Sequence, residues 1–339
     1  MIEKRTYARV GLMGNPSDGF YGRTISSCID NFYAEVRIDE NKSLIIKRHE
    51  VFDANEFQSL DDLESKLGRN GYYGGLRLIQ ATCKRFNQYC REMDIKLDNR
   101  NFVVEYNTNI PRQIGLAGSS AIIVSLTKGL MDFYKVTEHD IPSELLPNFV
   151  LSVETDELGI SAGLQDRVVQ CYGGTVYMDF DKSRMQDLGY GIYEHLDSKL
   201  VPKLFLAYFN SSGKNSGMIH SSVKDKFNQG DREITEKMKK LAKLTLDAKD
   251  ALIKGKKDRL GKLMDMNFDL RREIYGDDVI GKDNLKMINT ARKMDAPAKF
   301  PGSGGAVVGM YEDYEHLIKL EKAYADQGYK FARVEMGGV

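Results

Sequence analysis

The chain has 339 residues, of which 42% are hydrophobic and 29% charged, and its 49 lysines and arginines equal its 49 aspartates and glutamates in number. This length supports one large or two medium domains with an ample core. The net charge of zero argues against a nucleic-acid-binding or membrane-surface protein, but it leaves room for a local pocket that binds a small anion.

The first half of the chain alternates between strand-like and helix-like segments. Apolar, β-prone or alternating patterns predict strands at residues 7–13, 31–38, 44–48, 102–106 and 173–180. Apolar residues at helical spacing predict helices at residues 74–90, 121–134 and 147–158.

The second half begins after residues 181–199, where the pattern weakens into polar, turn-rich sequence. This weakening predicts a boundary between two domains, residues 1–190 and 191–339. A strand at 204–209, a long and mostly helical stretch, and a final strand, helix and strand (306–311, 313–327 and 329–336) are expected beyond it. Because strands and helices mix without a steady βαβ rhythm, we expect an α+β protein in two lobes.

The cysteines and the N-terminal residues favour a cytoplasmic protein. The four cysteines form no C-x-x-C pair and lie at no metal-ligand spacing from a histidine, so we expect reduced thiols. No apolar stretch of signal-peptide length opens the sequence, and no run of ~18 apolar residues occurs in it.

Small residues precede the helix expected at 121–134. Pro111 fixes the approach, and Gly115 and Gly118 allow backbone conformations in which amide groups converge on an anion. The helix adds its unpaired N-terminal donors, and Ser119 and Ser120 add hydroxyls for phosphate or magnesium. The simpler alternative is a buried helix with an ordinary cap, which needs one serine or threonine and no pair of glycines.

This loop is not a Walker A motif, because no lysine follows the second glycine. A nucleotide bound here would need other groups to neutralise its charge. Carboxylates that hold a metal ion are the natural candidates elsewhere in the chain.

Three segments together resemble the motifs of the GHMP kinases, which include galactokinases, homoserine kinases, mevalonate kinases and sugar 1-kinases. Residues 8–18 resemble the first motif and residues 300–306 the third, a glycine-rich turn that closes over the site. The second motif is the segment with the small residues, in the longer form that resembles glucuronokinases, heptose kinases and fucokinases: Gly115-Leu116-Ala117-Gly118-Ser119-Ser120-Ala121.

The resemblance implies an N-terminal lobe like ribosomal protein S5, a ferredoxin-like C-terminal lobe, and ATP and Mg²⁺ as cofactors. It implies that Pro111 and residues 115–121 bind ATP, that Ser120 and Glu154 hold the metal, and that Asp166 faces the acceptor hydroxyl as the base. Without the family, Glu154 and Asp166 are two of 49 acidic residues, and solvated positions are the simpler interpretation. Arg167 is expected to be a surface or structural group that could pair with Asp166.

The first motif carries the residues that would act on the sugar and the phosphoryl group. Arg9 resembles the arginine of galactokinases that lies near the catalytic aspartate; the alternative is a surface arginine at a strand edge. Galactokinases have G-E-H-T-D-Y where this chain has Gly14-Asn15-Pro16-Ser17-Asp18-Gly19, so their galactose contacts are not all reproduced. Asn15 and Asp18 remain candidate sugar-binding residues.

Residues 14–18, 22–26 and 110–113 look most like those of glucuronokinases. The resemblance implies ATP-dependent phosphorylation of D-glucuronate at its anomeric hydroxyl. A uronate needs a cationic partner for its carboxylate, and Arg23 is the first candidate and Lys299 the second, although Arg23 could instead anchor its loop. The glycine-rich turn adds Gly302, Ser303 and Gly304 to the expected substrate contacts.

Other functions are also compatible with the sequence. The main alternative is a 1-kinase for galacturonate, a heptose or fucose, in a monomer or homodimer. A non-catalytic sensor of sugar and ATP is disfavoured because Asp166, Glu154 and the phosphate loop are all present. Mevalonate-type chemistry is disfavoured because Arg9 stands where those kinases carry a lysine.

Overall fold

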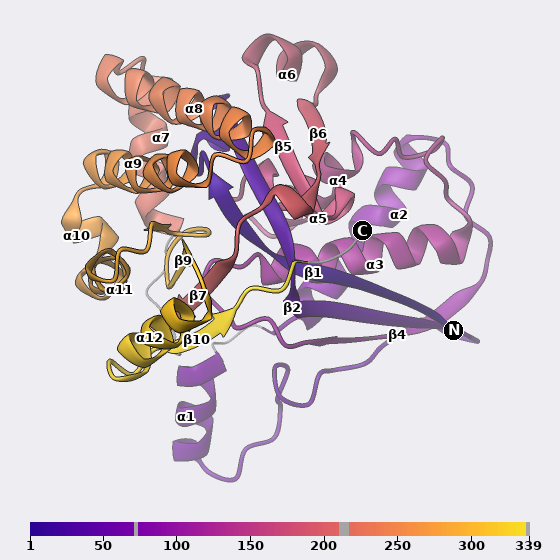
Figure 1. The fold of residues 1–339 in the computed structure, drawn as a ribbon. Coiled ribbons are helices and arrows are strands. Elements are labelled where there is room, and N and C mark those ends of the chain that lie inside the picture. The colour runs from indigo at the N-terminus through magenta and orange to yellow at the C-terminus, as the bar shows by residue number, and fades with distance from the viewer. Residues whose placement is uncertain (71–73, 210–216, 337–339) are drawn as a thin grey trace. The chain divides into compact units, whose positions relative to one another are not determined.

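The computed structural model describes residues 1–70, 74–209 and 217–336 of the chain (Figure 1). These residues form two compact units, each assembled from separate segments of the sequence. The first unit comprises Met1–Ala8, Phe32–Arg112 and Ala117–Tyr172, and the second comprises Arg9–Asn31, Gln113–Leu116 and Gly173–Val339. The predicted domain boundary after residue 190 stays a prediction.

Two long strands, β1 (Ile2–Met13) and β2 (Arg23–Asn41), contribute to both units. In the first unit, the second half of β2 pairs antiparallel with β4 (Asn101–Thr108), with Ala34 opposite Thr108. β4 in turn pairs in parallel with the short β3 (Ile45–Ile46). The strands expected at 7–13, 31–38, 44–48 and 102–106 are therefore confirmed, although β2 is much longer than its alternating segment.

Helices make up the rest of the first unit: α1 (Leu60–Asn70), α2 (Leu76–Glu92), α3 (Gly118–Tyr134), α4 (Leu146–Ser152) and α5 (Leu164–Tyr172). α3 is apolar nearly all round, so it is buried along most of its length. α4 ends at Ser152 and continues as a π-helical turn, Val153–Glu157, where the sequence predicted a single helix to residue 158. Such turns are frequent at functional sites.

In the second unit, the first half of β2 pairs antiparallel with β5 (Thr175–Asp179), and β5 pairs with β6 (Ile192–Leu196). A short 3₁₀ turn, Ser17–Phe20, precedes β2. The polar stretch at 181–199 is more ordered than predicted. It contains α6 (Lys182–Leu188), capped by the Asp181 side chain, and then β6.

A second sheet in this unit has the described order β10-β7-β9-β8, all antiparallel. Its strands are β7 (Leu204–Tyr208), β8 (Ala298–Lys299), β9 (Ala306–Met310) and β10 (Lys330–Arg333). The helices are α7 (Gly217–Asn228), α8 (Arg232–Ile253), α9 (Lys257–Tyr275), α10 (Asp277–Ile280), α11 (Lys282–Lys293) and α12 (Tyr314–Ala325). α8 and α9 lie side by side (Figure 1).

The core of the second unit forms between this sheet and its helices. Its buried side chains include Phe205 of β7, Phe268 of α9, Met287 of α11 and Tyr324 of α12, together with Phe300 beside β8. The glycine-rich turn therefore starts from a residue that is fixed in the core. Within the described residues, no helix is long and apolar enough to cross a membrane.

Candidate active site

The small residues of the second motif lead into a helix, α3, whose start is not capped by a side chain. Ala117 precedes α3 in the left-handed conformation, with φ 63°, and no side chain caps the helix. The Ala121 amide, in the first turn of α3, donates to the Ala117 carbonyl at 3.1 Å. The simple capped-helix alternative is therefore wrong. The partly exposed start of α3 offers backbone donors and the positive end of a helix dipole to an anion.

The two serines of this loop have different partners. Ser119 Oγ donates to Glu154 Oε1 at 2.8 Å. Ser120 is fully buried, and its Oγ donates to Gln170 Oε1 at 2.5 Å and to the Ala117 carbonyl at 3.2 Å. The structure thus brings Ser119, and not Ser120, to the predicted metal-binding carboxylate. A carboxylate and a hydroxyl are hard oxygen ligands of the kind that magnesium takes alongside phosphate oxygens, so these residues fit the ion.

Arg167 joins the two predicted catalytic carboxylates. It is only 4% exposed, and it donates to the Glu154 carboxylate, to the Gly163 carbonyl at 2.9 Å and to Asp166 Oδ2 at 3.5 Å. Glu154 is 2% exposed on the π-helical turn, and Asp166 lies in the first turn of α5. The solvated alternative for Glu154 is therefore wrong, and Arg167 is not a surface group.

Arg9 lies in the second unit and is also buried. Its Nη1 donates to the Gly115 carbonyl at 2.5 Å and to the Pro301 carbonyl at 3.0 Å, and its own amide donates to the Leu116 carbonyl at 3.2 Å. The alternative of a surface arginine is wrong. Arg9 connects residues of all three predicted motifs within this unit.

Lys299 and Asn15 support the glycine-rich turn from inside the second unit. Lys299 Nζ donates to Asn15 Oδ1 at 2.5 Å, to the Gly11 carbonyl at 2.6 Å and to the Phe300 carbonyl at 2.7 Å. Burial and the positive charges of Arg271 and Arg9 lower the pKa of Lys299 well below its ordinary value. Asn15 Nδ2 donates to the Phe300 carbonyl at 3.4 Å. Both side chains are thus engaged with protein groups.

The other predicted sugar-binding residues lie around the 3₁₀ turn of the second unit. Arg23 Nε donates to Asp179 Oδ2 at 2.6 Å, so its charge is already paired. Ser17 Oγ donates to the Arg23 carbonyl at 2.9 Å, which ties the turn to β2. Asp18 lies in this turn and is partly exposed.

The glycine-rich turn approaches Gly115 of the second motif very closely. A Cβ added to Gly302 would lie 2.2 Å from the Gly115 carbonyl oxygen, and Gly304 has a φ of 137°. Both positions therefore require glycine. The Gly302 carbonyl also accepts a hydrogen bond from Arg271 Nη1 at 2.7 Å, and the Ser303 carbonyl accepts one from Arg271 Nη2 at 3.2 Å.

Sequence reasoning missed Arg271 as a functional candidate and undervalued Arg167. Arg271 is one charged residue among many on an amphipathic helix, and no local pattern marks it as buried. Arg167 did carry a signal, because it adjoins Asp166 in a segment that the resemblance assigns to the site.

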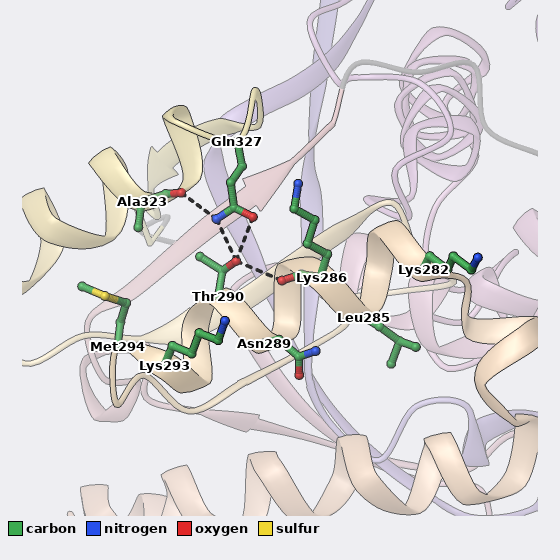
Figure 2. Close-up of a pocket in the computed structure, with 9 residues that line it drawn as sticks. All are labelled: Lys282, Leu285, Lys286, Asn289, Thr290, Lys293, Met294, Ala323 and Gln327. Atoms are coloured by element: carbon green, nitrogen blue, oxygen red, sulfur yellow. Dashed lines mark hydrogen bonds between the residues drawn. The ribbon is translucent and has the colours of Figure 1, made fainter.

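A cavity of about 540 Å³ lies elsewhere in the second unit, between α11 and α12 (Figure 2). None of the predicted site residues lines it. Thr290 and Gln327 hydrogen-bond to each other at its wall, and it is lined by Lys282, Leu285, Lys286, Asn289, Thr290, Lys293, Met294, Ala323 and Gln327. It is therefore separate from the residues assigned to phosphoryl transfer.

Comparisons with known proteins show what the chain resembles in sequence and fold. Residues 77–174 match the model of the GHMP kinases N terminal domain. The chain is 47% identical over 319 residues to "Glucuronokinase 1" of Arabidopsis thaliana, and the match covers 94% of this chain and 87% of that protein. It is also 23% identical over 296 residues to a D-glycero-alpha-D-manno-heptose 7-phosphate kinase of Campylobacter jejuni, with 85% of this chain and 81% of that protein covered.

Among solved structures, Lactococcus lactis galactokinase complexed with galactose matches with a TM-score of 0.74 at 13% identity, over 99% of this chain and 94% of that one. This match confirms the predicted two-lobed α+β fold. With the 47% identity to a plant glucuronokinase over nearly the whole chain, it leads to one assignment. The chain belongs to the GHMP kinase family.

Proposed function

We propose that this kinase transfers the γ-phosphoryl group of ATP to the anomeric hydroxyl of D-glucuronate, giving D-glucuronate 1-phosphate and ADP. The buried Arg167 carries the proposal, because it links Glu154 and Asp166 beside the uncapped start of α3. The choice of sugar is supported by the 47% identity to the plant glucuronokinase.

The phosphates would lie at the start of α3, where amides and the helix dipole favour negative charge. Ser119 and Glu154 would hold magnesium, which would offset the negative charge of the phosphates. The Ser119 hydroxyl and the Glu154 carboxylate lie 2.8 Å apart, so the two proposed ligands are already close together before magnesium binds.

Asp166 would accept the proton of the anomeric hydroxyl as the bond from that oxygen to phosphorus forms. The bond between the γ-phosphorus and the bridging oxygen breaks, and ADP takes the electron pair. Arg167 orients Asp166 and Glu154, and its positive charge balances part of the negative charge of the two carboxylates. Arg9 is proposed to stabilise charge on the transferring group.

The alternative acceptors are galacturonate, a heptose and fucose. The 23% identity to a heptose 7-phosphate kinase keeps a heptose among the alternative acceptors, but this identity is much lower than the 47% identity to the glucuronokinase. The balanced net charge supports a small-molecule substrate and gives no reason to propose a nucleic-acid partner. A cytoplasmic monomer or homodimer remains the proposal from sequence.

The direct test is ADP release from ATP and magnesium with glucuronate, galacturonate, galactose, fucose and a heptose, each at the same concentration. We expect turnover with glucuronate to exceed turnover with every neutral sugar. Turnover confined to a neutral sugar would keep the kinase assignment and overturn the uronate.

A further inference from the structure

Three cations lie buried around the glycine-rich turn of the second unit. Arg9, Arg271 and Lys299 are 4%, 5% and 1% exposed. They donate hydrogen bonds to four successive carbonyl groups, those of residues 300–303. Among the described residues, no carboxylate forms a salt bridge with Arg271 or Lys299. Because buried charge is costly without a counterion, Arg271 and Lys299 favour an anion nearby.

Two of the candidate partners for a uronate carboxylate are already engaged. Arg23 Nε donates to Asp179 at 2.6 Å. Lys299 has three N–H donors, and its Nζ makes three hydrogen bonds of 2.5 to 2.7 Å to protein oxygens. Lys299 therefore has no donor left for a substrate, and the charge of Arg23 is already paired with Asp179.

Arg271 differs from both. It uses Nη1 for the Gly302 carbonyl and Nη2 for the Ser303 carbonyl, and its buried Nε has no hydrogen-bond partner within residues 1–70, 74–209 and 217–336. Since guanidinium has five N–H donors, three remain, and Nε–H and the second Nη2–H lie on one edge of the group. That edge matches the two oxygens of a carboxylate.

The surroundings of Arg271 fix its plane and leave one end within reach. The guanidinium carbon lies 5.2 Å from the Phe300 ring centroid and 5.7 Å from that of Tyr275. The bond from Nη2 to Ser303 is only partly buried. Burial lowers the pKa of Arg271, Arg9 lowers it further, and Tyr275 and Asp18, the predicted partner of a sugar hydroxyl, raise it in part. A sugar acid bound to Asp18 would thus have its carboxylate near a cation.

We infer that Arg271 is the residue that recognises the carboxylate of a sugar-acid substrate, through Nε–H and Nη2–H. This inference rests on the proposed function and adds the residue that separates a uronic acid from the neutral sugar. Arg23 then anchors the 3₁₀ turn through Asp179, and Lys299 supports the glycine-rich turn.

The test compares kcat/KM for glucuronate with the affinity for glucose, measured by isothermal titration, in the full-length protein. A charge-assisted hydrogen bond contributes about 1.5–3 kcal/mol, so Arg271→Gln should lower kcat/KM for glucuronate on the order of 10- to 100-fold, mainly through KM. Affinity for glucose should change by less than about threefold. The matched control is Arg272→Gln on the same helix, which removes a surface pair with Asp277 and should change neither.

Each other outcome overturns a specific statement. An equal loss for both sugars would show that Arg271 only holds the glycine-rich turn in place. A loss in Arg23→Gln that is selective for glucuronate would show that Arg23 recognises the carboxylate. If Arg271→Gln does not fold, Arg271→Lys takes its place, because lysine keeps the positive charge but lacks the two parallel N–H donors. An unchanged KM of Arg271→Lys for glucuronate would contradict the inference. A wild-type enzyme that phosphorylates no sugar acid would instead contradict the proposed function.

Discussion

Among single residues, Asp166 has the most specific predicted role, because its contact with Arg167 places it at the edge of a buried charge cluster. The variant Asp166→Asn keeps the shape of the side chain and removes its ability to accept a proton. A positioned general base contributes typically 10²–10⁴-fold, so kcat should fall by about that factor while ATP binds as before.

The assay for Asp166→Asn combines steady-state kinetics with ATP titration, and Glu157→Gln is the matched control. Glu157 is paired with Lys84 at the surface, so its substitution should leave kcat within about twofold. Turnover of Asp166→Asn equal to that of the wild type would rule out its role as base.

The two loop serines should separate metal binding from folding. Ser119 Oγ contacts Glu154, so Ser119→Ala should raise the magnesium concentration needed for half-maximal rate. Ser120 Oγ is buried against Gln170, so Ser120→Ala should chiefly lower the free energy of unfolding, by about 1–3 kcal/mol. Magnesium titration and urea denaturation of both variants check this, and a reversed pattern would restore Ser120 as the ligand.

At the scale of elements, the glycine-rich turn is held by its close approach to Gly115. In Gly302→Ala the new Cβ would lie 2.2 Å from the Gly115 carbonyl oxygen and 2.9 Å from Arg9 Nη1. Overpacking of this kind costs typically 1–3 kcal/mol, and here it would also move carbonyls that the buried cations hold. We expect a lower urea midpoint and a lower kcat/KM.

Gly19→Ala is the matched control for the turn. A Cβ at Gly19 meets no atom within 4 Å, and its φ is not in the left-handed region. The urea midpoint of this variant should stay close to that of the wild type. Equal destabilisation in both variants would show that the close approach at Gly302 does not limit the turn.

At the scale of the whole molecule, buried thiols should make stability depend on pH in the alkaline range. Burial raises the pKa of Cys90 to about 11, from an ordinary value near 9.0. The unfolded chain therefore loses this proton first as the pH rises, so the free energy of unfolding falls between about pH 9 and pH 11. Cys90→Ala should reduce that slope.

Urea denaturation of both proteins at pH 8.5, 9.5 and 10.5 measures the difference in slope. The alanine also changes packing, but that changes the free energy of unfolding by the same amount at all three pH values. The difference in slope can therefore still be measured. Parallel curves for the wild type and Cys90→Ala would mean that the thiol titrates equally in both states.

The elements that could be predicted from the sequence are those that a local pattern of residues determines. Small residues before an apolar run marked the start of α3, and alternation marked the second half of β2. The sequence did not predict the first half of β2, where Ser26, Ser27 and Cys28 break the alternation and pairing with β5 forms the strand. The burial of Arg271 likewise depends on partners distant in the sequence, which no local pattern shows.

The central claim is that this kinase phosphorylates the anomeric oxygen of D-glucuronate. The most direct measurement is phosphorus NMR of the product formed from ATP, magnesium and D-glucuronate. We expect one new phosphomonoester whose phosphorus couples to the anomeric proton, formed in step with ADP. A phosphoester on another carbon, or ATP left unchanged while a neutral sugar is consumed, would contradict it.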